Sequence, residues 1–186
     1  MRHALTSKLL VASPTIGDPR FAGTVIYMCS HSDEHGMGLV INKPMGALVL
    51  PELLSQIGIE SSILAPKNPV LRGGPVDQAR GFVLHTDDYK AEDSTHEIAP
   101  GISITATKEV LSALASEAPP ERAVLALGYA AWGPGQLEDE LLENVWLIAD
   151  ADPEIIFDLD LETKWTRALS SIGVDPARLV HDGGHA

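Results

Sequence analysis

The chain has 186 residues and a formal net charge of −13, from 13 Lys and Arg against 26 Asp and Glu. This length is typical of one domain with its own core, and 45% hydrophobic residues exclude wholesale disorder. The acidic balance disfavours direct contact with nucleic acid, because each phosphate contact needs a cation that displaces a counterion. The few basic residues are scattered and form no run, so we expect no direct nucleic-acid binding.

The single cysteine, Cys29, excludes an intramolecular disulfide and a cysteine-cluster metal site, and it suits a reducing compartment. Residues 1–8 lack the apolar stretch of a signal peptide, and no run approaches the roughly 20 apolar residues of a membrane helix. We therefore expect a cytoplasmic protein with no membrane partner. Cys29 lies in an apolar segment, where a buried thiol is inert, and a redox-sensor role is the minor alternative.

Short runs of apolar and β-branched residues between turn residues predict strands. The predicted strands are Lys8–Ala12, Thr24–Ser30, Gly38–Asn42, Val70–Arg72, Gly81–His85, Ile102–Thr105, Val124–Tyr129 and Val145–Ile148. The second of these is apolar on both faces, which indicates a strand covered on both sides. The polar joint at residues 31–36 predicts a hairpin between the second and third strands.

Apolar stripes at helical spacing, bounded by capping residues and by Gly or Pro, predict helices. The predicted helices are 51–57, 107–118, 134–142, 153–157 and 165–172, and the third is expected to bury Leu137, Leu141 and Leu142. The order of elements lacks the regular alternation of a doubly wound sheet. It favours an α+β fold with a mixed, largely antiparallel sheet, as a single compact domain over 1–186, ordered from about 5 to 180. The C-terminal tail is expected to be mobile.

Residues 128–137, GYAAWGPGQL, leave a strand, pass through small residues and open a helix. Small residues let a ligand approach the backbone, a helix N-terminus attracts anions, and Trp132 could offer a stacking face. The glycine spacing matches neither phosphate-binding fingerprint, and Glu138 would repel a phosphate. A tight turn with Trp132 as a core plug is the favoured interpretation, with Gly135 and Gln136 as candidate ligand contacts.

Two further bends carry polar candidates. Gly73-Gly74-Pro75 suits a sharp bend after a strand, with glycine supplying positive φ. Asn42 and Lys43 could orient a substrate, although an Asn before a turn usually caps its own backbone. We expect these two bends and the Trp132–Gln136 turn to lie close together and to form one groove with a polar rim.

His85 ends a predicted strand just before two aspartates, where a carboxylate could orient it as a general base. No Ser or Cys nucleophile can be paired with it, so we assign no catalytic residue. A hydrolase that uses His85 with Glu138 or Glu140 is the alternative.

His31 and His35 are four residues apart, but this spacing makes a metal pair only on a helix, and the segment is predicted as a turn. We therefore expect no metal and no other cofactor.

Six segments follow one another along the chain in a characteristic order: 9–14 (LLVASP), 18–21 (DPRF), 31–44, 73–76 (GGPV), 81–85 (GFVLH) and 128–141. Each is weak by itself, but the ordered set resembles the YqgE/AlgH family, from about Leu9 to Gly173. The resemblance implies a compact α+β fold with a bifurcated sheet folded into a pseudo-barrel. It also implies bacterial cytoplasmic proteins of unsettled function that are often labelled transcriptional regulators, with no catalytic residues to carry over.

The regulator label conflicts with the charge of this chain and with the lack of a helix-turn-helix pattern. The leading hypothesis is a non-catalytic binding or regulatory module that would affect transcription indirectly, through a protein or small-molecule partner. The candidate ligand-binding residues are Asn42, Lys43, Gly73, Gly74, Pro75, His85, Trp132, Gly135, Gln136 and Glu138.

Overall fold

The computed structural model describes residues 5–15, 19–59 and 65–178, so the predicted mobile tail at 182–186 lies outside the described residues. The chain divides into two compact units, residues 1–42 with 131–186 and residues 43–130. It passes between the units after Asn42 and again inside strand β9 (Ala123–Trp132). At the second crossing the boundary therefore falls within a strand rather than in a linker.

The first unit is built on an antiparallel sheet with the strand order β10–β1–β2–β3. Its elements are β1 (Lys8–Ala12), β2 (Val25–His31), β3 (Gly36–Val40), α3 (Gln136–Leu142), β10 (Trp146–Asp150), α4 (Pro153–Ile156), the 3-10 helix η2 (Leu161–Thr163) and α5 (Lys164–Ser171). The predicted hairpin is confirmed, because β2 and β3 are paired and the Ser32 N–H donates to the His35 carbonyl at 2.8 Å.

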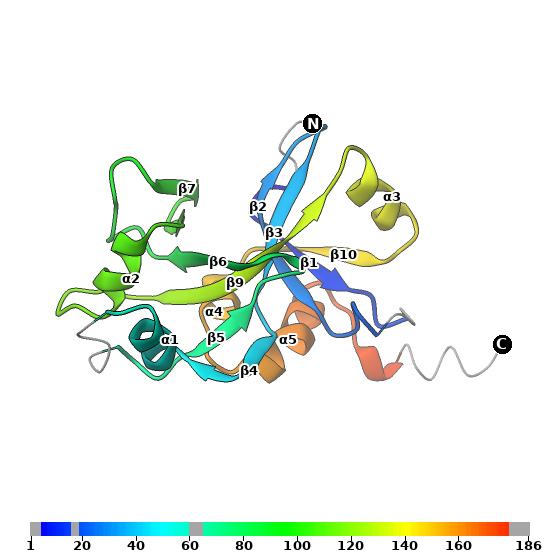
Figure 1. Ribbon diagram of the computed structural model, residues 1–186. Helices are drawn as coiled ribbons and strands as arrows, with labels where there is room; N and C mark the ends of the chain where they lie inside the picture. Colours follow the sequence, from blue (N-terminus) through cyan, green and yellow to red (C-terminus); the bar gives the residue numbers. More distant parts are fainter. Residues whose placement is uncertain (1–4, 16–18, 60–64, 179–186) are drawn as a thin grey trace. The chain divides into compact units, whose positions relative to one another are not determined.

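Strand β2 carries the core of the first unit. Val25, Ile26, Tyr27 and Met28 are all buried, so both faces of the strand are covered, as the apolar run predicts. Helix α5 packs against β1, β2 and β10 (Figure 1). The Trp165 indole N–H of this helix donates to the Ala12 carbonyl of β1 at 2.9 Å, which fixes the helix on the sheet.

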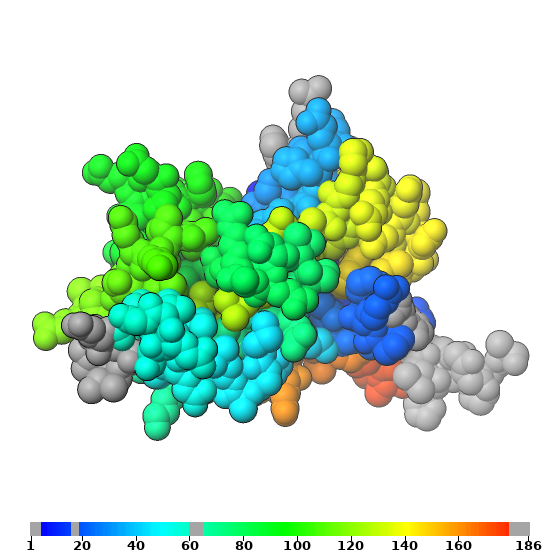
Figure 2. All heavy atoms as spheres, viewed as in Figure 1, coloured from blue at the N-terminus to red at the C-terminus, as the bar shows by residue number. Residues whose placement is uncertain are grey.

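The prediction that α3 buries Leu142 is wrong. Leu137 is buried and Leu141 is half-buried, but the Leu142 side chain is 83% exposed. Successive residues of a helix point about 100° apart, so the residue after the inward-facing Leu141 turns toward solvent. Figure 2 shows α3 (yellow) at the surface of the first unit.

The second unit holds a mixed sheet in which β9 pairs with two different strands. Its elements are β4 (Pro44–Val49), α1 (Leu50–Gln56), β5 (Pro69–Arg72), β6 (Val76–His85), β7 (Thr95–Ala99), β8 (Ile102–Thr105), α2 (Lys108–Leu114) and residues 123–130 of β9. The order β9–β6–β8–β7 is antiparallel, whereas β5 pairs with β9 in parallel and with β4 antiparallel. The predicted mixed, largely antiparallel sheet is confirmed.

Strands β4 and β7 are not predicted by the sequence pattern. β7 contains His96 and Glu97, which are exposed on an edge strand, so no apolar alternation marks it. β4 begins at Pro44, which has no N–H to donate, and Gly46 has a φ of +56°. Pairing with neighbouring strands, rather than side-chain pattern, makes these two segments extended.

The bend at Gly73 and Gly74 packs directly on the backbone of β9. A Cβ on Gly73 would lie 2.2 Å from the Gly128 carbonyl oxygen, and one on Gly74 would lie 2.1 Å from the Tyr129 carbonyl carbon. The Gly73 N–H also donates to the Leu127 carbonyl at 2.8 Å. These glycines are required because two stretches of main chain approach more closely than any side chain would permit.

The Gly128→Ala variant tests this constraint. Gly128 has a φ of +78°, and an added Cβ would lie 2.5 Å from the Gly74 carbonyl oxygen. Left-handed strain and backbone overlap together should lower the free energy of unfolding by about 3 kcal/mol or more. Urea unfolding followed by circular dichroism measures the loss.

Gly101→Ala is the matched control, since Gly101 has a φ of +83° but open space where the Cβ would lie. It should lose only about 1–2 kcal/mol, from the φ strain alone. Equal losses in the two variants would mean that the close approach of the strands contributes nothing.

Candidate functional site

His85, the predicted general-base candidate, ends β6 and is completely buried. Its Nδ1 lies 2.8 Å from the Thr86 carbonyl oxygen, so Nδ1 donates there and Nε2 accepts from the Thr105 hydroxyl at 2.7 Å. Burial lowers the pKa of His85 and keeps the ring neutral. Both ring nitrogens are used within the core, which is the environment of a structural histidine.

Asn42 is also used by the fold. Its side-chain oxygen accepts from the Val25 N–H at 2.9 Å, and its amide nitrogen donates to the Gly23 carbonyl at 2.7 Å. The Asn42 residue is only 8% exposed. Its two hydrogen bonds join the end of the β2–β3 hairpin to the main chain at residues 23–25. Lys43 follows as a half-exposed residue whose carbonyl accepts from the Arg72 N–H.

In the Trp132–Gln136 turn, only Trp132 packs inward, and residues 133–136 are exposed. Trp132 is 6% exposed and its indole N–H donates to a Glu140 carboxylate oxygen at 2.8 Å. Gly135 caps α3 in the left-handed conformation, and the Gln136 side-chain oxygen accepts from the Gly133 N–H at 3.1 Å. Trp132 thus occupies the position of the core plug that the favoured interpretation expects.

Glu138 lies 2.8 Å from His31 Nε2, joining α3 to the end of β2. The pKa of Glu138 is lowered, first by its own backbone N–H and then by His31. His35 faces elsewhere, with its ring nitrogens near the Ser30 and Ser32 hydroxyls. Among the described residues, no group of three or more His, Cys, Asp or Glu side chains is arranged to hold a metal ion.

Burial raises the pKa of the Cys29 thiol to about 12, so the group is protonated at neutral pH. A thiol in this state is a poor nucleophile and a poor metal ligand. The sulfur donates weakly to the Tyr27 carbonyl at 3.7 Å.

The predicted candidates within the second unit do not form one cluster. His85 pairs with Ala123 at the start of β9, whereas Gly73 and Gly74 lie against Gly128 and Tyr129. At about 3.3 Å per residue, these places are roughly 20 Å apart along the strand. Gly73 and Gly74 are covered by main chain and Pro75 is exposed. The groove predicted from all three bends joins segments of both units and stays a prediction.

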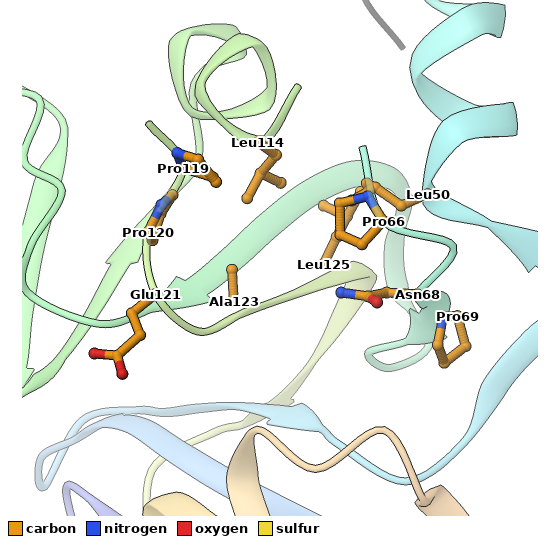
Figure 3. Close-up of a pocket in the computed structure, with 10 residues that line it drawn as sticks. All are labelled: Leu50, Pro66, Asn68, Pro69, Leu114, Pro119, Pro120, Glu121, Ala123 and Leu125. Carbon is orange, nitrogen blue, oxygen red and sulfur yellow. The ribbon is translucent and has the colours of Figure 1, made fainter. Parts of the chain in front are cut away.

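An open pocket of about 160 Å³ lies elsewhere in the second unit, where α1, α2 and β9 come together (Figure 3). Leu50, Leu114 and Leu125 form its floor and belong to the hydrophobic core of this unit. The remaining lining residues are Pro66, Asn68, Pro69, Pro119, Pro120, Glu121 and Ala123. Sequence reasoning missed this pocket, because its leucines have the pattern of ordinary core positions and its prolines that of helix and turn boundaries.

Comparison with known proteins then assigns the chain. The model of the DUF179, AlgH-like, family matches residues 9–177. The chain belongs to the AlgH-like family. It is 51% identical to a UPF0301 protein of Caulobacter vibrioides over 183 residues, which covers 98% of this chain and 94% of that protein. A UPF0301 protein of Bradyrhizobium diazoefficiens is 49% identical, with 98% and 88% covered.

Solved structures agree with this assignment. The AlgH protein of Pseudomonas aeruginosa is 40% identical, with a TM-score of 0.77 and coverage of 98% of this chain and 96% of that one. A Corynebacterium diphtheriae protein, DIP2367, is 20% identical with a TM-score of 0.68 over 88% and 86%, and it supports the fold alone. The α+β class that the resemblance implies is confirmed. In the described part of this AlgH-like chain, no helix has the length and apolar character needed to cross a membrane.

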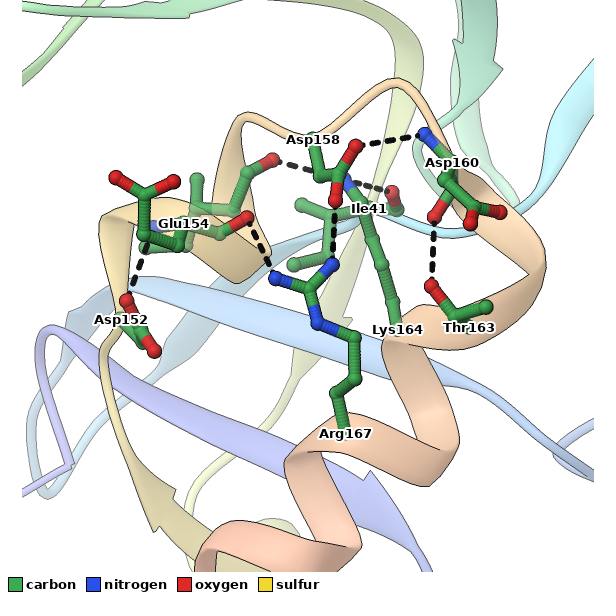
Figure 4. A network of polar contacts seen from close by, with 9 residues as sticks. Ile41, Asp152, Glu154, Asp158, Asp160, Thr163, Lys164 and Arg167 are labelled. Carbon is green, nitrogen blue, oxygen red and sulfur yellow. Dashed lines mark hydrogen bonds and ion pairs between the residues drawn. The ribbon is translucent and has the colours of Figure 1, made fainter.

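A buried lysine in the first unit of the AlgH-like fold also escaped the sequence analysis, because a basic residue in an amphipathic helix is usually exposed. Lys164 is 0% exposed, and its ammonium donates to the Ile41 and Ile156 carbonyls at 3.0 and 2.8 Å (Figure 4). Beside it, the Asp158 carboxylate accepts hydrogen bonds from Arg167 and from the Asp160 N–H. The network ties the residue after β3 to α4 and α5.

This network predicts a pH dependence of stability. Burial lowers the pKa of Lys164 from 10.5 to about 8. The folded chain therefore loses this proton at a lower pH than the unfolded chain, and stability rises with pH between about 8 and 10.5. The full difference should be about 3 kcal/mol, measured as the free energy of unfolding of the native protein minus that of Lys164→Met.

The subtraction is needed because the pKa of Tyr27 and that of Cys29 are both raised to about 12 by burial. Those two groups make stability fall with pH from about 9 for Cys29 and about 10 for Tyr27, which overlaps the range of Lys164. Their contributions cancel between the native protein and the variant. Urea titrations at pH 7, 8, 9 and 10 give the curve, with the exposed Lys90→Met as control. A difference that stays constant with pH would contradict the role of the buried ammonium.

Proposed function

We propose that this AlgH-like protein is a binding or regulatory module without chemistry of its own. One observation carries the proposal: an open pocket of about 160 Å³ lies between α1, α2 and β9 and has an apolar floor. A concave, mostly apolar site with few polar groups is the usual form of a ligand site. The partner is a protein segment or a small molecule, and any effect on transcription is exerted through it.

The charge supports an indirect role. At a net charge of −13, the chain repels a polyanion, and its 13 Lys and Arg are scattered rather than gathered in a run that could release counterions from phosphates. The acidic composition and single thiol also fit the cytoplasm, where we place the protein.

The alternative, a hydrolase that uses His85 with Glu138 or Glu140, has less support. His85 is buried with both ring nitrogens bonded, and Glu138 and Glu140 are engaged by His31 and Trp132. A general base must reach the proton that it removes. Opening this part of the core would be required before His85 could touch a substrate.

Filling the pocket tests the proposal. Ala123 lines it with its Cβ, so Ala123→Leu should occupy the space and leave stability unchanged or slightly higher. NMR titration with a panel of small aliphatic alcohols, amides and carboxylates should shift the Leu50, Leu114 and Leu125 methyl signals of the native protein. The same panel should leave those of Ala123→Leu unchanged.

The matched control is Ala131→Leu, the same change at an exposed position of the same strand. It should bind as the native protein does. If no member of the panel shifts the pocket signals of the native protein, the proposal fails.

A further inference from the structure

We infer that the pocket takes an aliphatic side chain from a segment of a partner protein, with the neighbouring peptide amide hydrogen-bonded to Asn68 and a basic residue beside it. This inference rests on the proposed function and names the occupant of the same site. Three properties of the lining carry it: the volume, the supply of hydrogen-bonding groups and the charge.

The volume suits one side chain rather than a whole metabolite. Sites for drug-sized ligands and cofactors usually have about 300–1,000 Å³, whereas this pocket has about 160 Å³. Its floor is formed by three leucines of the core. Pockets of this kind hold single anchor residues at the centre of protein interfaces.

The lining has few hydrogen-bond donors. Pro66, Pro69, Pro119 and Pro120 have no N–H, and prolines also make the walls rigid. The Leu50 N–H donates to the Asn68 carbonyl, and the Asn68 N–H donates to the Pro66 carbonyl. These two N–H groups are therefore not available to a ligand. The lining therefore has no cradle of main-chain N–H groups for a carboxylate or phosphate.

Asn68 provides the polar contact. Its side chain is half-buried, points into the pocket in Figure 3 and makes no hydrogen bond to another described residue. A carboxamide offers one acceptor and two donor hydrogens, which is the complement of a peptide group. Asn68 thus favours a neutral amide next to the bound side chain.

The negative charge of Glu121 at the opening of the pocket favours a basic residue next to the bound side chain. Glu121 is exposed at the edge of the pocket, and its backbone N–H is held by the Asp88 carboxylate at 2.9 Å. The ten lining residues include this carboxylate and no Lys, Arg or His. An anionic ligand would meet this carboxylate with no cation among the lining residues, whereas a Lys or Arg next to the anchor would face an opposite charge.

The first experiment compares two probes that share the acetyl-leucine group and differ only at the C-terminal end. Acetyl-leucine methylamide is neutral and carries two peptide groups, whereas acetyl-leucine carries a carboxylate. By NMR titration of the native protein, the methylamide should shift the pocket methyl signals and bind at least about tenfold more tightly than the acid. Asn68→Ala should weaken methylamide binding by about fivefold to tenfold, and the exposed neighbour variant Lys67→Ala should leave it unchanged.

The second experiment tests the flank with acetyl-Leu-Lys amide and acetyl-Leu-Glu amide. The native protein should prefer the lysine peptide by a factor of about three to ten at low salt, and Glu121→Gln should remove the preference. Equal binding of the two peptides by the native protein would overturn the charge argument.

The outcomes separate the inference from the proposed function. If alcohols or carboxylates bind the pocket but the leucine amides do not, the inference fails and the proposed function stands. Tighter binding of acetyl-leucine would identify a site for a small anion instead. If the methylamide binds but both peptides are excluded, the occupant is a small molecule and not a protein segment. If nothing binds, both fail.

Discussion

The second unit depends on one close approach of main chain to main chain, at Gly73 and Gly74 against Gly128 and Tyr129. Because no side chain separates these segments, β5 can pair with β9 in parallel while β6, which follows the bend, pairs with β9 antiparallel. Residues 123–130 of β9 thus pair with two strands of the second unit. The same strand carries Ala123 and Leu125 into the pocket, so the glycine contact and the candidate binding site share a single support.

The polar residues that are most noticeable in the sequence are used to hold the fold together. His85, Asn42 and Trp132 are each less than 9% exposed, and each has a hydrogen-bond partner within its own unit. A buried polar group that loses its partner costs about 1–3 kcal/mol, which is sufficient reason for these residue types at these positions. Function is therefore better sought where apolar surface is left open, and the pocket beside α1 and α2 is such a place.

Lys164 illustrates the opposite case, a charge held inside the first unit by carbonyl oxygens rather than by a direct carboxylate partner. Burial of an ammonium is unfavourable, and for this reason the pKa of Lys164 is lowered. The two carbonyls belong to segments far apart in the sequence, so the ammonium specifies how they are placed relative to α5. A residue that the sequence shows only as one of several scattered cations is thus part of the core.

The sequence by itself determined the α+β class, the family, most strands and the hairpin at residues 31–36, because these follow from local periodicity, turn residues and the order of motifs. It also indicated that Trp132 packs inward, but not that the Asn42 side chain bonds to the distant residues Gly23 and Val25. Only the tertiary structure decided that Gly73 and Gly74 leave room for the backbone of β9. It also decided that Leu142 faces solvent and that Lys164 is buried. It alone located the pocket, since Leu50, Leu114 and Leu125 come from three elements. Such facts depend on which segments meet in space, and a local pattern carries no information about the partner that a residue will face.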